Sequence, residues 1–278
     1  MPEAVPACGW ILWAGTVGLE GPLAARFAAA AAAGYQRVSL SPPEVLRAGR
    51  PAAEIASRAR DLGLGLVVDP VMNWYPDSSP PTSRFAGVST DDALRLGADL
   101  DATALTVLAT PHSDIPLPAL AEHFARVCDR AADFGAQVQL EFIPYTVVSG
   151  LRVAWEIVRA ADRPNGGLVF DTWHFYRGDP DFGVLAAVPG ERIFAVQLDD
   201  APAQPTGPLR AETMARLLPG DGELDLVGAI RALHTLGALR WIGPEVMNPE
   251  LNVRPPEEVA RLAMERTRAV LTTALGRR

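Results

Sequence analysis

The stretch GAQVQLEFIPYTVVSGLRVAWEIVRAADRPNGGLVFD, residues 135–171, contains one complete strand–helix–strand unit. The apolar run VQLEFIP at 138–144 predicts one strand, and GGLVFD at 166–171 predicts the next. Between them, residues 153–161 have the apolar spacing of an amphipathic helix. A helix that connects two such buried strands is typical of the βαβ unit, so this stretch predicts an α/β fold with a parallel sheet.

The same alternation of a short apolar run with a longer amphipathic stretch recurs about eight times along the chain. The other predicted strands are 10–14, 37–40, 64–70, 104–109, 192–198 and 240–246, and the other predicted helices are 21–33, 52–62, 90–97, 118–134, 226–236 and 256–275. The chain has 278 residues, close to the roughly 250 of a closed eight-stranded α/β barrel. No low-complexity linker divides it. We therefore expect a (β/α)8 TIM barrel that forms a single domain over residues 1–278.

Composition excludes several classes of partner. The net charge of −8 and the pI near 5.1 argue against nucleic acid, because such binding draws its affinity from clustered Lys and Arg. No apolar run approaches the about 20 residues of a membrane span, and residues 1–15 lack the positively charged start of a signal peptide. Cys8 and Cys128 are far apart and form no CxxC or Cys/His cluster. We expect a cytoplasmic protein without membrane or nucleic-acid partners.

Four predicted strands end in a side chain that offers oxygen. Glu141 follows VQL, Asp171 follows LVF, Gln197 follows FAV and Glu245 follows IGP. Each residue alone could be a solvated loop residue or a helix cap. Three carboxylates that converge on one end of a barrel would repel each other unless a cation lay between them. The pattern therefore predicts one divalent metal ion, with Mg²⁺ or Mn²⁺ favoured by the oxygen ligands and Co²⁺ or Zn²⁺ as alternatives.

The second half of the chain resembles a known family. The strings that carry the resemblance are LEFIP, NGGLVFDTWHFYRGDP, RIFAVQLDDAP, RLLPGDGELDL and GPEV, between residues 140 and 246. They resemble the sugar phosphate isomerase/epimerase family, the xylose isomerase-like TIM barrels, which also include 3-dehydroshikimate and inosose dehydratases. The resemblance implies that Glu141, Asp171, Gln197 and Glu245 ligate one metal. Gln at the seventh strand resembles the dehydratase-type members, whereas the keto-sugar 3-epimerases have His there.

Other residues are candidates for the substrate pocket. His174 lies three residues after Asp171, and an imidazole with an ordinary pKa near 6.5 can exchange a proton at neutral pH. The resemblance implies that it contacts substrate, and a loop histidine bonded to backbone is the alternative. The resemblance likewise implies that Arg216 reaches the substrate's oxygens, where a guanidinium can bind a carboxylate or two hydroxyls. The alternative is a surface Arg216 paired with Glu212 at i, i+4.

Two further segments have structural alternatives. Asn73 and Trp74, in the long loop after the third strand, are candidates for a wall over a ring-shaped substrate, and packing of the barrel mouth is the alternative. The string PGDGELDL at 219–226 predicts a turn followed by a helix that Asp225 caps, because it lacks the lysine of a phosphate-binding loop.

These residues together predict a metal-dependent isomerase or epimerase of a small polyhydroxylated ketone. In this hypothesis a proton is abstracted next to a metal-bound carbonyl, with Glu141 and Glu245 as acceptor and donor and His174 steadying or shuttling a proton on oxygen. A dehydratase of the 3-dehydroshikimate or inosose type is the alternative, favoured by Gln197 and by Arg216. A barrel that binds a sugar-like ligand without turnover is a weaker alternative. The partner would be a small molecule, and the sequence leaves a homo-oligomer open.

Overall fold

Eight parallel strands form a closed barrel in the structure, which is a computed structural model that describes residues 8–76, 78, 85, 87–111 and 113–276. Each strand pairs with the next in the sequence, and the first pairs with the last. The strands are β1 (Gly9–Leu12), β2 (Arg37–Leu40), β3 (Gly65–Val71), β4 (Ala104–Leu108), β5 (Gln137–Glu141), β6 (Gly166–Asp171), β7 (Ile193–Leu198) and β8 (Trp241–Pro244). This arrangement confirms the predicted TIM-barrel fold.

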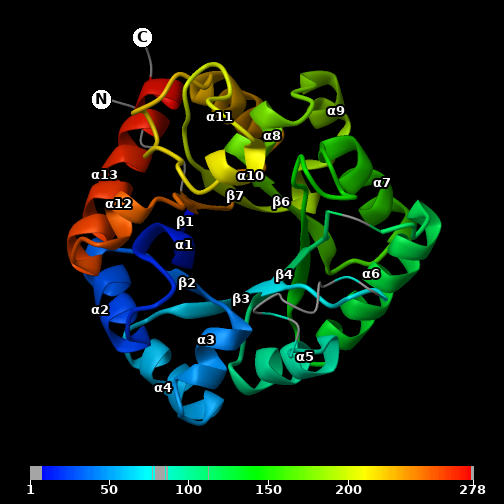
Figure 1. Cartoon of the computed structure of the whole chain (residues 1–278), viewed down its shortest axis with the longest axis vertical. Coiled ribbons are helices and arrows are strands. Elements are labelled where there is room, and N and C mark those ends of the chain that lie inside the picture. The colour runs from blue at the N-terminus through cyan, green and yellow to red at the C-terminus, as the bar shows by residue number, and fades with distance from the viewer. Residues whose placement is uncertain (1–7, 77, 79–84, 86, 112, 277–278) are drawn as a thin grey trace.

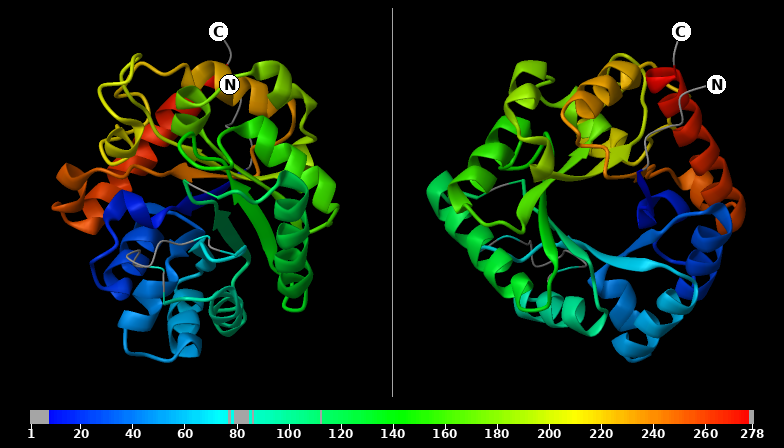
Figure 2. Two further views of the ribbon diagram at one scale, coloured as in Figure 1. Left: turned by 45° about the vertical axis from the view of Figure 1, so that its right-hand side comes forward. Right: turned by 180° about the vertical axis from the view of Figure 1, so that it is seen from behind.

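Helices surround the barrel as an outer ring (Figures 1 and 2). The longer helices are α2 (Leu23–Ala33), α4 (Ala52–Asp61), α5 (Thr90–Asp99), α6 (Leu117–Ala132), α7 (Leu151–Ala161), α11 (Leu226–Thr235) and α13 (Pro256–Leu275). Helix α13 packs against α2 and α11, so the last helix closes the ring beside the first long one (Figure 1). Each of these helices overlaps a predicted one. The predicted end of the first helix at residue 33 is confirmed, and Gly34 follows it with a left-handed φ of 85°.

Short helices lie in the loops that follow strands, and the sequence analysis did not predict them. They are α1 (Ala14–Val17), α3 (Pro42–Arg47), α8 (Thr172–Arg177), α9 (Phe182–Ala187), α10 (Leu209–Glu212), α12 (Pro249–Asn252) and a 3-10 turn at Gly190–Arg192. Helices of four to six residues show too few turns for an apolar period to stand out. The first strand is correspondingly shorter than predicted, since the chain turns into α1 at Ala14 instead of extending through it.

The barrel interior is packed by alternate strand residues. Buried side chains of one cluster come from β1, β3, β4, β6 and β7, and they are Ile11, Trp13, Val67, Ala104, Val169 and Ala195. Side chains two residues apart on a strand share a face, so positions 69, 171 and 197 continue the inward-facing rows of Val67, Val169 and Ala195. These rows end in polar residues at the carboxyl ends of the strands. An apolar interior below and a polar layer above is the arrangement that positions a site at this end of the barrel.

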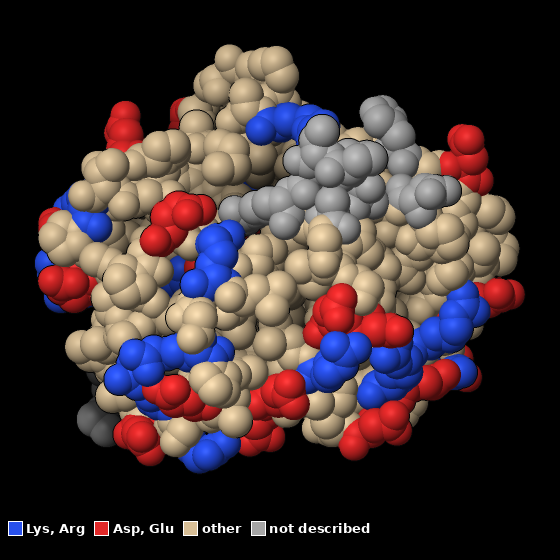
Figure 3. Space-filling view, turned by 60° about the horizontal axis from the view of Figure 1, so that its bottom comes forward, with Lys and Arg blue, Asp and Glu red and all other residues tan. Residues whose placement is uncertain are grey.

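Acidic and basic side chains are intermixed over the face shown in Figure 3. Several exposed pairs are in contact, for example Arg95 with Asp92 at 3.1 Å and Arg152 with Asp181 at 2.9 Å.

In the described part of the chain, no helix is both long enough and apolar enough to cross a bilayer.

Candidate active site

The four predicted ligand residues lie at neighbouring strand ends. Glu141 is the last residue of β5, Asp171 is the last of β6, and Gln197 in β7 is the register partner of Asp171. Glu245 directly follows β8, and its backbone N–H donates to the carbonyl of Leu198 in β7 (3.1 Å). All four are buried, with exposed fractions of 4%, 0%, 0% and 7% in chain order. The closed barrel thus brings together side chains that are separated by about a hundred positions of sequence.

Helix α1 holds the backbone on both sides of Glu245. The Thr16 hydroxyl donates to the carbonyl of Pro244 (2.9 Å) and accepts from the backbone N–H of Val246 (3.0 Å). Thr16 is fully buried, so these bonds are shielded from water. The short helix that the sequence analysis did not predict therefore fixes the direction of one predicted ligand.

A second short helix places His174 beside the acids. Asp171 caps α8, where its Oδ1 accepts from the backbone N–H of His174 (2.7 Å). His174 Nε2 lies 3.1 Å from Oε1 of Glu141. One potential ligand atom from each of Glu141, Asp171 and His174 lies within 4.8 Å of the other two, a spacing that a single metal ion can bridge. The structure thus brings His174 to the predicted centre.

Gln197 has a polar side chain that no described residue satisfies. Its Oε1 and Nε2 are both buried and neither has a hydrogen-bond partner among the described residues. Buried polar atoms are almost always paired, so an unpaired buried amide calls for a ligand, an ion or water. An amide oxygen beside two carboxylates is a suitable donor for a hard divalent cation. The residues present therefore fit the predicted metal.

Arg216 is buried among the acids instead of lying on the surface. Its Nη1 is 2.8 Å from Oδ2 of Asp171, 2.5 Å from Oδ2 of Asp199 and 3.7 Å from Oε2 of Glu245. The alternative of a surface pair with Glu212 is wrong. Glu212 pairs instead with Arg177 (2.6 Å), and Arg216 points from the loop after β7 into the buried centre.

The electrostatics of this centre favour an additional cation. Burial, followed by repulsion from the neighbouring carboxylates, raises the pKa of Glu141 well above its usual range. The same causes raise the pKa of Glu245 to about 8, and burial raises that of Asp171 to about 6. Asp171, Asp199 and Glu245 lie within 4.0 Å of the one guanidinium of Arg216, and Glu141 contacts His174. The raised pKa values mean that burial disfavours the ionised form of these acids in the metal-free centre, and a divalent ion would favour that form.

His174 is neutral in this setting. Burial, and then the positive charge of Arg216, lower the pKa of His174 well below its usual value. Its Nε2 is within hydrogen-bonding distance of both Glu141 Oε1 (3.1 Å) and Arg216 Nη2 (3.1 Å). A neutral imidazole has one donor and one acceptor nitrogen, so proton exchange with Glu141 needs no intermediate group.

Two acids near the centre were not singled out from the sequence. Asp199 follows β7 and accepts from the hydroxyl of Thr172 (2.6 Å) and the backbone N–H of Trp173 (2.7 Å), in addition to its contact with Arg216. Asp69 of β3 lines a cavity together with Glu141 and Glu245, and its charge contributes to the raised pKa of both glutamates. Both follow apolar strand runs, so the signal that identified the four ligands applies equally to them.

A cavity of about 280 Å³ opens onto the acids. Glu141, His174, Arg216 and Glu245 are among its lining residues, whereas Asp171 and Gln197 are fully buried behind them. The volume is near the lower end of ligand pockets, which suits a molecule of the size of a simple sugar.

The structure places Asn73 and Trp74 outside that cavity. The Asn73 amide donates to the carbonyls of Phe85 and Val88, and the Trp74 indole donates to the carbonyl of Leu108 (2.7 Å). Neither is among the described residues that line the cavity. Their donors hold the long loop against the barrel, so the geometry favours the packing alternative for both. Most of the tip of that loop, residues 77, 79–84 and 86, lies outside the described residues.

The loop that follows Arg216 has the predicted structural role. Asp225 caps α11, and its side chain accepts from the backbone N–H of Gly228 (2.8 Å). This confirms the expected turn and helix cap in PGDGELDL.

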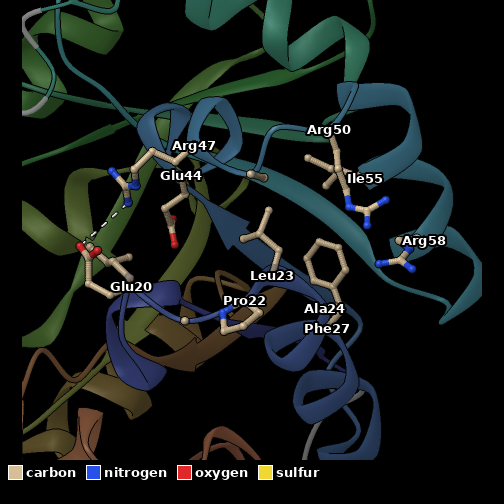
Figure 4. Close-up of a pocket in the computed structure, with 13 residues that line it drawn as sticks. Glu20, Pro22, Leu23, Ala24, Phe27, Glu44, Arg47, Arg50, Ile55 and Arg58 are labelled. Carbon is tan, nitrogen blue, oxygen red and sulfur yellow. Dashed lines mark ion pairs between the residues drawn. The ribbon is translucent and has the colours of Figure 1, made fainter.

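A second cavity, of about 440 Å³, lies outside the barrel among α2, α3 and α4 (Figure 4). Arg47, Arg50 and Arg58 stand around it, and Leu23 and Phe27 are among its apolar lining residues. The two cavities share one lining residue, Leu19. The buried acid Glu44 in this second cavity is already paired with Arg26 (2.5 Å), so it offers no comparable excess of buried charge.

Comparison with known proteins gives consistent matches. A family model described as "Xylose isomerase-like TIM barrel" matches residues 27–270. An inosose isomerase from Bacillus velezensis is 34% identical over 154 residues, which are 55% of this chain and 54% of the relative. A 3-dehydroshikimate dehydratase from Pseudomonas aeruginosa is 29% identical over 248 residues, which are 86% of this chain and 38% of the relative. The chain thus spans about half, or less, of the length of these curated relatives.

Solved structures share the fold. The crystal structure of an "IOLI protein with a binding zinc atom" superposes with a TM-score of 0.83 at 19% identity, covering 96% of this chain and 99% of that one. An L-ribulose 3-epimerase superposes with a TM-score of 0.74 at 17% identity, covering 96% and 95%. At these identities the superpositions show a common barrel and nothing finer.

Proposed function

This chain belongs to the xylose isomerase-like TIM-barrel family, and from that premise we propose that it is a divalent-metal-dependent isomerase or epimerase of a small polyhydroxylated ketone. The observation that carries the proposal is the pair Glu141 and Glu245. Both carboxylates reach one cavity from different strands, and both have a pKa raised above its usual range by burial first. Without a cation, a carboxyl with a raised pKa keeps its proton at neutral pH and can donate it, whereas a divalent ion held beside it would favour the ionised form that accepts one.

The proposed metal ligands are Glu141, Asp171, Gln197 and Glu245, with His174 within reach of the same centre. A divalent ion held there would polarise a carbonyl oxygen of the substrate and so acidify the neighbouring C–H bond. The oxygen donors favour Mg²⁺ or Mn²⁺. The zinc in the IOLI protein structure and the nearby imidazole keep Zn²⁺ as an alternative.

The residues of the chain would move one proton between carbon atoms. Glu141 or Glu245 takes a proton from the carbon next to the carbonyl, the C–H electron pair forms a carbon–carbon double bond, and the carbonyl pair moves to oxygen. Return of the proton to the opposite face of the same carbon gives an epimer. Its return to the former carbonyl carbon gives an isomer, as the hydroxyl on the neighbouring carbon loses its proton to become the new carbonyl and the former carbonyl oxygen gains one. His174 lies 3.1 Å from Glu141, so it can pass a proton between that carboxylate and a substrate oxygen.

Dehydration is the second candidate, and one finding favours it. The 3-dehydroshikimate dehydratase aligns over 86% of this chain, more than the 55% for the inosose isomerase. The first step would be the same proton transfer to Glu141 or Glu245. A hydroxyl on the β-carbon would then leave as water after it receives a proton from His174 or the second glutamate, and a conjugated double bond would remain.

Solvent exchange distinguishes these outcomes. The Mn²⁺-loaded protein is incubated in D₂O with ketoses, inososes and 3-dehydroshikimate, and the mixtures are followed by proton NMR and ultraviolet absorbance. Carbon-bound deuterium in an epimer or isomer supports the first proposal, whereas absorbance from a conjugated product supports dehydration. A protein that binds Mn²⁺ but shows neither result with any of these compounds contradicts both and favours a sugar-binding barrel without turnover.

A further inference from the structure

Arg216 is already occupied by the protein. Its Nη1 donates to Asp171 and Asp199, and its Nη2 contacts Thr213 Oγ1 (2.9 Å) and His174 Nε2 (3.1 Å). Its Nη1 also donates to the carbonyl of Glu245 (3.3 Å), so five contacts share the four N–H bonds that the two Nη atoms carry. The remaining Nε is buried. Two carboxylates also balance its single charge, so Arg216 is poorly suited to bind a substrate carboxylate.

A second arginine lines the same cavity without such partners. Arg210 lies on α10, is exposed, and has its guanidinium carbon 5.7 Å from the centre of the Tyr145 ring. Both residues line the cavity. Among the described residues, no carboxylate lies within 4.0 Å of the Arg210 nitrogens, so its charge is available to a ligand at the cavity rim.

The cavity therefore has opposite charge at its two ends. Glu141, Glu245 and Asp69 line the end of the cavity at the strand termini. The exposed Arg210 belongs to the loop after β7, and its guanidinium lies over the ring of Tyr145, which belongs to the loop after β5. The proposed metal would take up the oxygens of these acids, so the charge that a substrate anion can contact at the rim is that of Arg210. A charged substrate would thus be oriented with its carbonyl and hydroxyls toward the acids and its anionic group toward Arg210.

We propose that Arg210 is a specificity residue that selects a polyhydroxylated ketone carrying a carboxylate over its neutral counterparts. This inference rests on the proposed function and names its substrate class. Tyr145 contributes a flat apolar face that holds the guanidinium, and its ring also lines the path of the substrate. The carboxylate would form charge-assisted hydrogen bonds with Arg210.

The second cavity, which lies among α2, α3 and α4 (Figure 4) and is called the flank cavity below, supplies a matched control. Arg47 is also about half exposed, with only a distant pair to Glu20 at 3.9 Å, and it lines the flank cavity instead of the catalytic one. An anion that binds among Arg47, Arg50 and Arg58 would respond to Arg47 and not to Arg210. The two arginines therefore separate binding at the active site from adventitious binding nearby.

The test is calorimetric titration of the Mn²⁺-loaded protein with shikimate and with its uncharged primary amide, which have the same ring. We expect the native protein to bind the acid about fivefold more tightly than the amide. Arg210→Gln should reduce this preference to less than about twofold by weakening binding of the acid alone, Arg210→Lys should keep part of it, and Arg47→Gln should leave it unchanged.

Each other outcome has a definite meaning. An unchanged preference in Arg210→Gln, or equal binding of acid and amide by the native protein, overturns the role of Arg210 and leaves the proposed function standing. Loss of the preference in Arg47→Gln places the anion in the flank cavity and also overturns it. If neither compound binds at millimolar concentration, the polyol site itself is contradicted, and the proposed function fails together with the inference.

Discussion

Gln197 contributes a neutral ligand to a centre that is otherwise acidic. Its amide is fully buried, and its two polar atoms have no partner among the described residues. A neutral donor leaves the bound ion with more positive charge than a fourth carboxylate would. At the scale of single residues, this side chain is therefore a direct test of whether the centre binds metal.

We predict that Gln197→Ala weakens Mn²⁺ binding by roughly 10- to 100-fold, because one oxygen donor is lost from a buried site. Calorimetric titration of the metal-free protein with Mn²⁺ measures the change. Gln139→Ala is the matched control, since Gln139 is also buried in a barrel strand, β5, but its amide donates to Thr106 (2.9 Å). Equal loss of affinity in both variants would indicate general damage to the barrel and contradict a ligand role for Gln197.

Replacement of either glutamate should stop proton transfer. Glu141→Gln and Glu245→Gln remove the proposed acceptor and donor with little change of shape, so solvent deuterium exchange into substrate should fall by about 10²- to 10⁴-fold. Glu44→Gln provides the control, because Glu44 is equally buried but is paired with Arg26 away from the cavity of the acids. That variant should lose stability and keep its exchange rate per folded molecule. Full exchange in both Glu141→Gln and Glu245→Gln would refute their proposed roles.

At the scale of elements, strand ends were predicted from the sequence better than loops. The rule that a polar residue ending an apolar run faces the centre located Glu141, Asp171, Gln197 and Glu245, because strand residues alternate between two faces. The same rule fits Asp69 and Asp199, which the sequence analysis passed over. A strand end is defined by local pattern, and that is why it can be found without knowledge of the fold.

The loop residues could not be predicted in this way. The direction of Arg216 depends on contacts with Asp171 and Asp199, which are 45 and 17 positions away, and its local spacing fits a surface pair with Glu212 equally well. Asn73 and Trp74 follow a strand on the catalytic side, yet the Asn73 amide donates to a loop carbonyl and the Trp74 indole donates to the carbonyl of Leu108 at the end of β4. Loop side chains are placed by tertiary contacts, and no sequence period encodes these contacts.

Asp199 connects the loop after β7 with helix α8, so its replacement should lower the stability of the folded protein. It holds Arg216 from the loop after β7 and Thr172 and Trp173 at the start of α8. Asp199→Asn replaces one acceptor oxygen by an amide N–H₂ group among the buried donors of Arg216, Thr172 and Trp173, so we expect a loss of about 3 kcal/mol in the free energy of unfolding. Urea denaturation measures it. The control Asp91→Asn, which removes an exposed pair with Arg130, should change stability by less than about 1 kcal/mol, and equal effects would contradict the connecting role.

At the scale of the whole molecule, closure of the barrel creates both the site and the electrostatic repulsion among its buried acids. The ends of strands β5 to β8 bring together four buried carboxylates, those of Glu141, Asp171, Asp199 and Glu245, and the last three of them contact the guanidinium of Arg216. The order of the elements was predictable from the sequence, whereas the excess of buried charge follows only from closure. The expected cytoplasmic location, the single domain over residues 1–278 and the open homo-oligomer remain predictions.

The burial and repulsion of these acids predict how the stability of the whole barrel depends on pH. In the metal-free protein the pKa of Glu245 is raised to about 8, mainly by burial, and that of Glu141 is raised well above its usual range. In the unfolded chain such groups lose their protons near pH 4.5. Between these values the folded protein binds more protons than the unfolded chain, so its stability must fall as pH rises. His174 opposes this only below about pH 6.5, where its unfolded form is charged.

We therefore expect the free energy of unfolding of the metal-free protein to decrease from pH 6.5 to pH 8, measured by urea denaturation in the presence of a chelator. Mn²⁺ competes with these protons, so its stabilising effect should grow over the same range. At a hundred times its dissociation constant it should reach about 2.7 kcal/mol. In Glu245→Gln the pH-dependent fall should shrink, because one titrating carboxylate is gone. A metal-free stability that rises with pH in this window, or a Mn²⁺ effect that does not, would show that the buried acids are not the groups that strain the folded barrel.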